Sequence, residues 1–408
     1  MLKKFLDLGQ QPLANSYLRK SQLKKKEKKL KLELLFDDKS YLVSIKNKIP
    51  KHQMFNSSYP YRSSQSKTMQ ISFRKIANEI KKRFNPKLIV EIGSNDGAFL
   101  KNFSKNKIIG IEPCKNVAKV TKKKGFVTID KYWTKSLARS LFKKKKVNLI
   151  YSANTLSHIE NLNETFTAIN IALNKDGILI LEGPALLPCL KFNIYDQFYC
   201  EHIYVFSTLS LSNILKKYKL EIFDLQNLDT HGGSTRYFIK KKNNNKIKIL
   251  KTVRREINKE VRFGLKKFST YKKFSKNIKK SKFKLKKLLK DLQLKNKKVI
   301  GYGATAKSCT VLNYCKIGPT LINYFLDTTP DKINKFLPGS KIFIKKYKKL
   351  NKKDVDFVFL GAWNFKKEIF KKESLFIKQG GKFITHIPNV KIISDKDMRG
   401  KIWKKIFW

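Results

Sequence analysis

The 408 residues contain only five cysteines, and no two of them are spaced as C-x-x-C. This scatter argues against a zinc ribbon and against a framework of disulfide bonds. It suits a reducing compartment, so we expect the protein in the cytoplasm. The five positions are Cys114, Cys189, Cys200, Cys309 and Cys315.

Long apolar runs are also missing. The best candidate, GILILEGPALLPCL at 177–190, is shorter than the roughly 18 residues of a membrane span, and Glu182 and two prolines interrupt it. The basic N-terminus lacks an apolar stretch followed by small residues, so no signal peptide is predicted. We therefore expect no membrane partner.

Acidic residues are scarce: 30 Asp and Glu stand against 91 Lys and Arg, which gives a formal net charge of +61. Such an excess is typical of nucleic-acid-binding proteins. However, the basic residues are 81 Lys and only 10 Arg, spread over every segment, whereas phosphate and base recognition favours arginine. The joint abundance of Lys, Ile, Asn and Phe is what codon drift in an AT-rich genome produces. We predict no nucleic-acid partner, although charge alone leaves an RNA methyltransferase open.

Short apolar runs alternate with helical stretches such as 163–175, and an apolar fraction of 41% indicates a globular chain. Strands spaced in this way predict parallel pairing in a doubly wound α/β sheet over 76–240. The predicted strands are KLIVEIG (87–93), KIIGIEP (107–113), VNLIYSAN (147–154) and GILILEGP (177–184).

The flanking regions differ in character. Residues 1–75 lack strong periodicity, and 241–295 are dominated by lysine with sparse apolar positions, which predicts a helical, largely solvated connector. Residues 296–408 repeat the strand–helix alternation, in KVIGYGATAKS, LINYFLD, VDFVFLGAWN and GGKFITHIP. The chain is therefore predicted to hold two Rossmann-like units.

The first glycine-rich turn is VEIGSNDGAFL, where a strand runs into a helix. Gly93 and Gly97 permit a tight turn, and Asn95 tolerates a left-handed conformation. Glu91 precedes the turn, and Glu112 ends the next strand, where a carboxylate can accept both hydroxyls of a ribose. Acidic residues at both places, without G-x-G-x-x-G, fit S-adenosylmethionine (SAM) better than a dinucleotide.

The second turn, GYGATA, matches G-x-G-x-x-A through Gly301 and Gly303, and Asp327 ends the next strand. Taken alone, it suggests NAD. Lys307 directly after the turn also suits a phosphate-bearing substrate. A dinucleotide site, a contact with a substrate nucleotide and a purely structural turn therefore stay open.

The segment YDQFYCEHIYVFS places Tyr199, Glu201 and His202 within four residues, among aromatics and without a lysine. In a chain this rich in lysine, the segment is unlike a solvated face. Its residue types are those of general acid–base catalysis, which predicts an acid–base site.

Seven stretches together resemble the successive motifs of nucleotide-sugar C-methyltransferases, from Asp7 to about Pro388. They are DLGQQPLAN, EIGSNDG, GIEPCKNVA, ANTLSHIENLNE, YDQFYCEH, THGGSTR and GYGATAKSCTVLNYC. The resemblance implies an N-terminal zinc module, a central class I SAM-binding domain and a C-terminal Rossmann-like domain that helps hold a nucleotide sugar.

The resemblance also implies the chemistry, which is methylation at C-3 of a 4-keto deoxysugar through an enolate. His202 matches the family's catalytic base, and Tyr199 and Glu201 match its neighbours. His158 matches another active-site histidine, which can polarise the ketone. Cys200 stands where the family often has histidine, so fine substrate preference is open.

Further residues follow from the same resemblance. We expect a nucleotide-sugar substrate and a monomer or homodimer. The expected cofactor-binding residues are Glu91, Gly93, Asn95, Asp96, Gly97, Glu112 and Asn154, and the expected substrate-binding residues are His231, Arg236, Gly301, Gly303 and Lys307.

One departure concerns the zinc module, which in the family uses four cysteines around the D-L-G stretch. No cysteine precedes Cys114 in this sequence, so we predict no structural zinc and no other metal. Because that module lacks its zinc-binding cysteines, a catalytically inactive SAM-binding scaffold is one alternative function. An NAD-dependent oxidoreductase that uses residues 301–327 is another.

Overall fold

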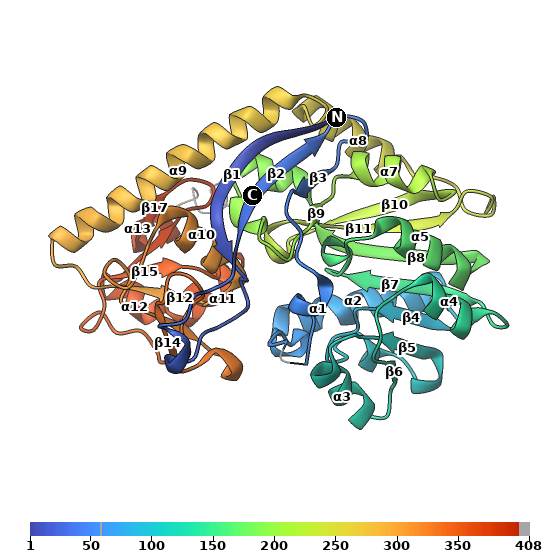
Figure 1. The fold of residues 1–408 in the computed structure, drawn as a ribbon, viewed down its shortest axis with the longest axis horizontal. Coiled ribbons are helices and arrows are strands. Elements are labelled where there is room, and N and C mark those ends of the chain that lie inside the picture. The colour runs from blue at the N-terminus through green and yellow to red at the C-terminus, as the bar shows by residue number, and fades with distance from the viewer. Residues whose placement is uncertain (58, 400–408) are drawn as a thin grey trace.

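The computed structural model describes residues 1–57 and 59–399, and three β-sheets organise them (Figure 1). The central unit, drawn cyan to green, and the C-terminal unit, drawn orange to red, lie on opposite sides of the molecule. The N-terminal strands, drawn blue, run between them. The main cavity of the molecule is lined by residues from all three parts of the chain.

The central sheet has seven strands in the order β10-β11-β8-β7-β4-β5-β6. Strands β4 to β8 pair in parallel, which confirms the predicted doubly wound sheet, whereas β11 is antiparallel to β8 and β10. The strands are β4 (Ile89–Ile92), β5 (Ile108–Ile111), β6 (Val127–Ile129), β7 (Val147–Ala153), β8 (Leu173–Pro184), β10 (Leu220–Leu228) and β11 (Ser234–Lys241).

Helices cover both faces of this sheet, so successive residues of a strand are buried on opposite sides. Ile89 and Leu149 pack in one apolar cluster, while Val90 and Ile150 pack in the other. This explains the near-continuous apolar runs of the sequence. The predicted boundary at residue 75 falls inside the first of the helices, which are α2 (Lys67–Arg83), α3 (Lys115–Lys123), α4 (Lys135–Phe142), α5 (Leu162–Ala172), α6 (Leu186–Lys191) and α7 (Thr208–Lys216).

The C-terminal unit confirms the second Rossmann-like fold. Its sheet order is β14-β13-β12-β15-β16-β17, parallel except for β17. The predicted unit extends to residue 408, and its last part, 400–408, lies outside the described residues. The elements are β12 (Val299–Tyr302), β13 (Tyr324–Asp327), β14 (Phe343–Lys346), β15 (Phe357–Leu360), β16 (Lys382–Thr385), β17 (Lys391–Ile393), α10 (Ala306–Cys315), α11 (Lys366–Lys372), α12 (Ser374–Lys378) and α13 (Asp395–Arg399).

The N-terminal region forms an antiparallel sheet, which the sequence did not indicate. It contains β1 (Leu2–Pro12), β2 (Lys29–Asp37) and β3 (Val43–Ile45), followed by the short helix α1 (Lys51–Met54). Its fourth strand, β9 (Tyr204–Val205), comes from the central unit and pairs with β3. The N-terminal sheet is therefore completed by residues that directly follow the predicted acid–base segment.

The connector is helical, as predicted, but it is not a solvated linker. It consists of α8 (Lys251–Phe263) and α9 (Phe268–Leu294), separated at Gly264, whose φ of +97° ends α8. Tyr271 of α9 stacks on Phe36 of the N-terminal sheet, with ring centroids 4.3 Å apart. The apolar face of α9 thus packs on the N-terminal sheet, and its lysines face outward.

All five cysteines are unpaired, buried thiols. Within the described residues, no helix is both long enough and apolar enough to cross a membrane.

Short 3-10 turns connect the longer elements and hold several residues of interest. The turns span Lys20–Gln22, Ser63–Gln65, Leu100–Asn102, Lys105–Lys107, Leu156–His158, Tyr195–Gln197, Thr230–Gly232, Pro330–Lys332 and Trp363–Phe365.

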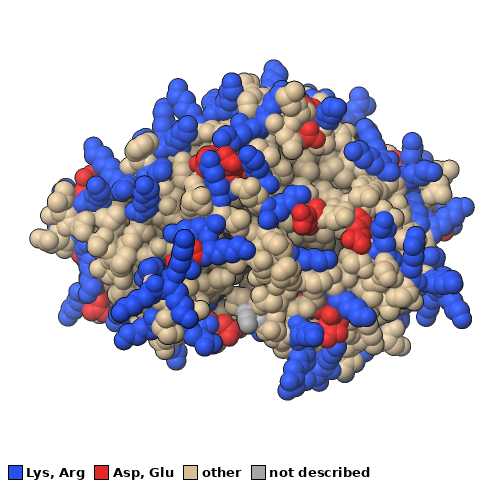
Figure 2. Space-filling model, in the orientation of Figure 1, with Lys and Arg blue, Asp and Glu red and all other residues tan. Residues whose placement is uncertain are grey.

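Lysine and arginine side chains are scattered over the visible face of the molecule, on both large units and between areas of other residues (Figure 2). They do not gather into one stripe or groove on this face. On this face, the basic side chains therefore mark no single candidate surface for a nucleic acid.

Candidate active site

A cavity of about 1120 Å³ lies where the carboxyl ends of strands from both parallel sheets face each other. Parallel α/β sheets bind ligands at these ends, because the loops that follow the strands diverge there. Glu91 on β4, Asn154 after β7 and Glu112 after β5 line one side, and Gly303 after β12 and Asp327 on β13 line the other. The two glycine-rich turns therefore border one cavity.

The first turn has the backbone that the sequence predicted. Gly93, Asn95 and Gly97 have φ values of +76°, +48° and +83°. A Cβ on Gly93 would lie 2.2 Å from Oγ1 of Thr155, so no other residue fits at this position without displacing its neighbour. Glycine thus keeps the cavity side of the turn open.

Acceptor atoms without donors surround this turn. The Oε2 atom of Glu91, Oγ of Ser94 and Oδ1 of Asn154 are buried and have no hydrogen-bond partner among the described residues. Burial, with Glu112 nearby, raises the pKa of Glu91 well above its usual value. Glu112 itself accepts hydrogen bonds from the backbone N–H groups of Asn95 and Cys114, both at 2.9 Å. A ligand that brings N–H and O–H donors and positive charge fits these residues, as SAM does.

The structure does not bring two of the expected cofactor residues to the cavity. Asp96 accepts hydrogen bonds from Oγ of Ser63 at 3.0 Å and from the backbone N–H of Ser64 at 3.1 Å, so it holds the loop over the turn. A Cβ on Gly97 would lie 2.8 Å from Thr121, so Gly97 serves close packing. Their roles are structural because their contacts are with other loops and helices.

His202 is buried, and its hydrogen bonds define its tautomer. Nδ1 lies 2.8 Å from the carbonyl oxygen of Gln197, which can only accept, so Nδ1 carries the proton. Nε2 lies 2.6 Å from the hydroxyl of Tyr199 and accepts its hydrogen bond. Burial, with His158 nearby, holds the pKa of His202 well below its usual value. The imidazole is therefore neutral at neutral pH, with its lone pair on Nε2.

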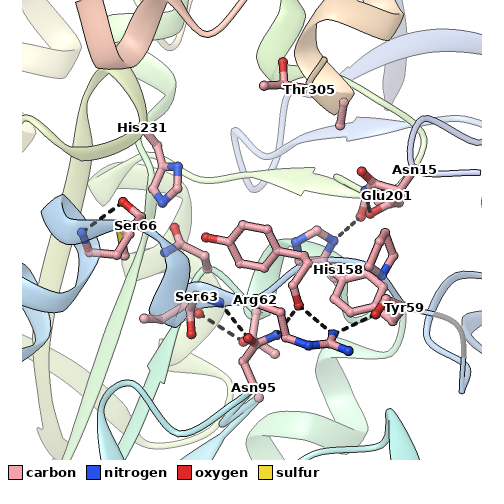
Figure 3. Close-up of a pocket in the computed structure, with 18 of the residues that line it drawn as sticks. Asn15, Tyr59, Arg62, Ser63, Ser66, Asn95, His158, Glu201, His231 and Thr305 are labelled. Atoms are coloured by element: carbon pink, nitrogen blue, oxygen red, sulfur yellow. Dashed lines mark hydrogen bonds between the residues drawn. The ribbon is translucent and has the colours of Figure 1, made fainter. Parts of the chain in front are cut away.

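Glu201 lies beside His158 and Asn15 (Figure 3). Nδ2 of Asn15 donates to both carboxylate oxygens of Glu201, at 2.8 and 2.9 Å. Burial raises the pKa of Glu201 to about 7, and the hydrogen bonds from Asn15 oppose this rise. Near neutral pH, Glu201 can therefore donate or accept a proton.

The hydrogen bond of His158 to the backbone defines its tautomer. Its Nδ1 lies 2.8 Å from the carbonyl oxygen of Glu201 and donates to it, and its ring centroid is 4.8 Å from that of His202. Burial lowers the pKa of His158 to about 4. The neutral imidazole in this tautomer has its lone pair on Nε2. The expected role of His158 in polarising a ketone stays a prediction.

On the opposite side of the cavity, the structure brings together His231, Lys307 and Gly303. Nζ of Lys307 donates to the carbonyl oxygen of His231 at 2.9 Å and lies 4.8 Å from the ring centroid of Trp363. Burial lowers the pKa of His231 to about 3, and its Nε2 has no partner among the described residues. Gly303 has a φ of +85°, and a Cβ there would lie 2.4 Å from Cβ of Ala362.

Two expected substrate residues lie away from the cavity. Arg236 on β11 is buried in the sheet, where its Nε and Nη2 atoms contact Oε2 of Glu182 at 3.0 and 2.9 Å. Its Nη1 donates to Gln226 at 2.9 Å. Gly301 is inside β12, where a Cβ would meet the ring of Phe325 at 2.4 Å. Both residues therefore stabilise the sheets.

Sequence reasoning missed several residues of the cavity wall. Tyr59, Tyr61 and Arg62 come from the YPYR stretch at 59–62, for which the sequence predicts no role in a site. Nη1 of Arg62 donates to the carbonyl oxygen of Tyr59 at 2.8 Å. Asn15 is in the quoted PLAN motif, but its spacing along the chain carried no signal of contact with Glu201. Further lining residues are Thr305, Lys332, Tyr347 and Lys372.

Comparison with known proteins assigns families to almost the whole chain. Residues 64–225 match a methyltransferase domain, residues 229–388 a C-methyltransferase C-terminal domain, and residues 1–55 a putative zinc binding domain. The chain is 28% identical over 395 residues to the C-methyltransferase NovU of Streptomyces niveus. The aligned residues cover 95% of this chain and 94% of the relative. The second glycine-rich turn thus lies in a C-methyltransferase domain.

Solved structures overlap with part of the chain. A SAM-dependent methyltransferase from Thermotoga maritima, described as a possible histamine N-methyltransferase, is 22% identical, with a TM-score of 0.31 over 41% of this chain and 88% of that chain. A SAM-dependent methyltransferase from Clostridium acetobutylicum is 12% identical, with a TM-score of 0.33 over 42% of this chain and 91% of that chain.

The residues of the N-terminal match do not fit a zinc site. Residues 1–55 contain no cysteine, and His52 is the single histidine. Across the part of the chain that the structure describes, no three His, Cys, Asp or Glu side chains form a group that can hold a metal ion. Glu33, a buried acidic residue of this region, contacts Lys4 at 2.9 Å. Aromatic packing on α9 contributes to holding this sheet in place.

Proposed function

Because the chain belongs to the SAM-dependent C-methyltransferases, as a relative of NovU, we propose that it methylates a keto nucleotide sugar, at C-3 of a 4-keto deoxysugar through an enolate. The observation that carries this proposal is the position of Tyr199, Glu201 and His202 in one cavity with both glycine-rich turns. A substrate in this cavity can therefore place its reacting carbon between the acid–base residues and the cofactor turn while another part of the same molecule contacts Lys307.

The cofactor side of the cavity is formed by the first turn. Glu91, Asn154 and Glu112 would hold SAM, which supplies an electrophilic methyl group when bound. The unpaired oxygens of Glu91 and Asn154 attract a ligand that carries an amino group and a sulfonium. Gly93 keeps the backbone close to that ligand.

His202 is the proposed base. Its Nδ1–H is anchored on Gln197, so the ring presents Nε2 as the only basic atom. When the Tyr199 hydroxyl turns from Nε2 toward the ketone oxygen, Nε2 accepts the proton from C-3. The electron pair of the C–H bond then enters the enolate, whose oxygen receives the Tyr199 hydrogen bond.

Glu201 lies next to this pair and is the second residue that can move a proton. Its pKa of about 7 suits donation to the enolate oxygen in the protonated form. In the charged form it can serve as the base in place of His202. The two assignments predict different responses to substitution.

The substrate side is formed by the C-terminal unit. Lys307 and Gly303 lie at the start of α10, and Lys332 and Lys372 line the same end of the cavity. Ammonium groups and a glycine turn at a helix N-terminus suit a diphosphate. A nucleotide sugar bound there by its diphosphate would reach toward His202 with its sugar ring.

The test is mass spectrometry of a panel of 4-keto nucleotide sugars incubated in D2O with and without SAM. We expect methyl addition with SAM and deuterium uptake at C-3 without it. His202→Asn, which keeps a polar side chain, should lower both rates by about 10²- to 10⁴-fold. Binding of SAM, measured by calorimetry, should be unchanged in this variant.

The outcomes separate the alternatives. Loss of exchange in Glu201→Gln but not in His202→Asn would assign the base to Glu201. Reaction with none of the sugars, despite SAM binding, would contradict the proposed acceptor. Steeply salt-dependent RNA binding would favour an RNA methyltransferase, and NADH binding an oxidoreductase. Unchanged behaviour of every variant would favour the inactive scaffold.

A further inference from the structure

The N-terminal sheet is joined directly to the acid–base segment. Strand β9 starts two residues after His202, and it pairs with β3 through Ser44 and Tyr204. The backbone N–H of Ile45 donates to the carbonyl oxygen of Ile203 at 3.0 Å. Any movement of the sheet therefore moves the backbone next to His202.

The loop after β1 approaches the same segment from another side. It carries Asn15, whose Nδ2 contacts both carboxylate oxygens of Glu201 across 186 residues of sequence. The hydroxyl of Tyr17 donates to the carbonyl oxygen of Ala304 at 2.8 Å, so the C-terminal unit holds this loop in place. The Asn15 amide is thus anchored independently of the acid–base segment.

Glu201 lies in the wall between two cavities. A second cavity of about 260 Å³ shares Asn15, Tyr59 and Glu201 with the main one. The Asn15 side chain is half-buried and occupies the boundary beside the carboxylate. Its removal would leave both oxygens of Glu201 without the contacts that the structure shows for them.

We propose that Asn15 is a positioning residue of the reaction, which holds the Glu201 carboxylate in the orientation and charge state that proton transfer at the substrate requires. This inference rests on the proposed function, because it assigns the acid–base role to the Glu201 site. It gives the N-terminal sheet a role in catalysis that is independent of zinc.

The surroundings of Glu201 explain why one amide matters. Burial disfavours the charged carboxylate, and the two hydrogen bonds from Asn15 favour it. Arg19 and Lys335 line the smaller cavity, but neither forms an ion pair with Glu201 within the described residues. The other titratable groups that face this site are Tyr17, Tyr59, Cys114, His158, Tyr199, Cys200, His202 and Cys309.

The first test is the pH profile of deuterium uptake and methyl transfer. Without the amide of Asn15, the charged carboxylate loses its donor, so the limb of the profile set by Glu201 should move to higher pH by about one unit in Asn15→Ala. Asn15→Asp adds a like charge and should move it further. Asn47→Ala removes an amide that donates to the carbonyl oxygen of Lys31 in the same sheet but lines neither cavity, and it should leave the profile unchanged.

The second test needs no substrate, so its result can be interpreted even if the proposed function is wrong. The folded pKa of Glu201 is raised, so its contribution to stability is fully present below pH 4.5 and is lost as pH rises through about 7. Asn15→Ala should therefore lower Tm more at pH 8, where Glu201 is charged, than at pH 5. In the Glu201→Gln background, this pH dependence should vanish.

Two results would overturn the inference. One is an Asn15→Ala profile that coincides with the wild-type profile while the rate falls. The other is a loss of Tm that is equal at pH 5 and pH 8, since that would assign to Asn15 a purely structural contact.

Discussion

The two glycine-rich turns share one backbone design but differ in the charge that they present. In the central unit, Glu112 accepts hydrogen bonds from the backbone N–H groups of Asn95 in the turn and of Cys114 two residues after it. In the C-terminal unit, Asp327 accepts hydrogen bonds from the backbone N–H of Ala304 in the turn and from that of Thr329, two residues after Asp327. Both distances are 2.8 Å. In each unit, a carboxylate at the end of the second strand therefore accepts a hydrogen bond from the glycine-rich turn and fixes the position of that turn.

The side chains around each turn decide what it can attract. The first turn is surrounded by the unpaired acceptors of Glu91, Ser94 and Asn154. At the second turn, Thr305 caps α10 and Lys307 faces the cavity. The first therefore suits a cationic cofactor and the second an anionic substrate. Similar folds acquire different ligands through a few neighbouring side chains.

The largest expected effect comes from a substitution that disturbs the first glycine-rich turn and leaves the second unchanged. In Gly93→Ala, the new Cβ meets Thr155 and the left-handed backbone costs alanine roughly 1–2 kcal/mol. SAM binding, measured by calorimetry, should weaken by about a hundredfold through displacement of the turn. Gly380→Ala is the matched control, because Gly380 has a φ of +89° and open space around its Cβ position. Equal SAM affinity in Gly93→Ala and wild type would refute the assignment of this turn.

The second turn is tested by its lysine. Lys307→Met keeps the apolar stem and removes the ammonium, so the KM for the nucleotide sugar should rise by about tenfold or more. The affinity for SAM should be unchanged, which separates the two halves of the cavity. Lys279→Met on the exposed face of α9 provides a control for loss of net charge. A KM that is unaffected by Lys307→Met would argue that the second turn is only structural.

The smallest expected effect is a pH dependence at the first turn. Because burial and the neighbouring Glu112 raise the pKa of Glu91, and a bound cation would lower it, SAM binding should favour the charged carboxylate and release protons where the two pKa values differ. Affinity for SAM should therefore rise with pH in the wild type, by up to about tenfold. Glu91→Gln should remove this dependence. If the affinity for SAM changes equally with pH in the wild type and in Glu91→Gln, Glu91 is excluded as the source of the pH dependence.

The sequence by itself determined what depends on neighbours along the chain. Apolar runs ended by Gly and polar residues predicted both parallel sheets, since buried strands have no solvent face. The left-handed conformation of Asn95 agrees with the tolerance of asparagine for a positive φ. The contacts of His202 with Gln197 and Tyr199 span only five and three residues, so the short motif already contained them.

Only the tertiary structure decided the contacts between distant segments. The bond from Asn15 to Glu201, the pairing of β9 with the N-terminal sheet and the burial of Arg236 against Glu182 join residues that sequence spacing does not relate. Whether a polar residue faces a cavity or a buried partner depends on the path of the chain, which composition does not encode. For the same reason, the carbonyl that sets the tautomer of His158 became visible only in the folded protein.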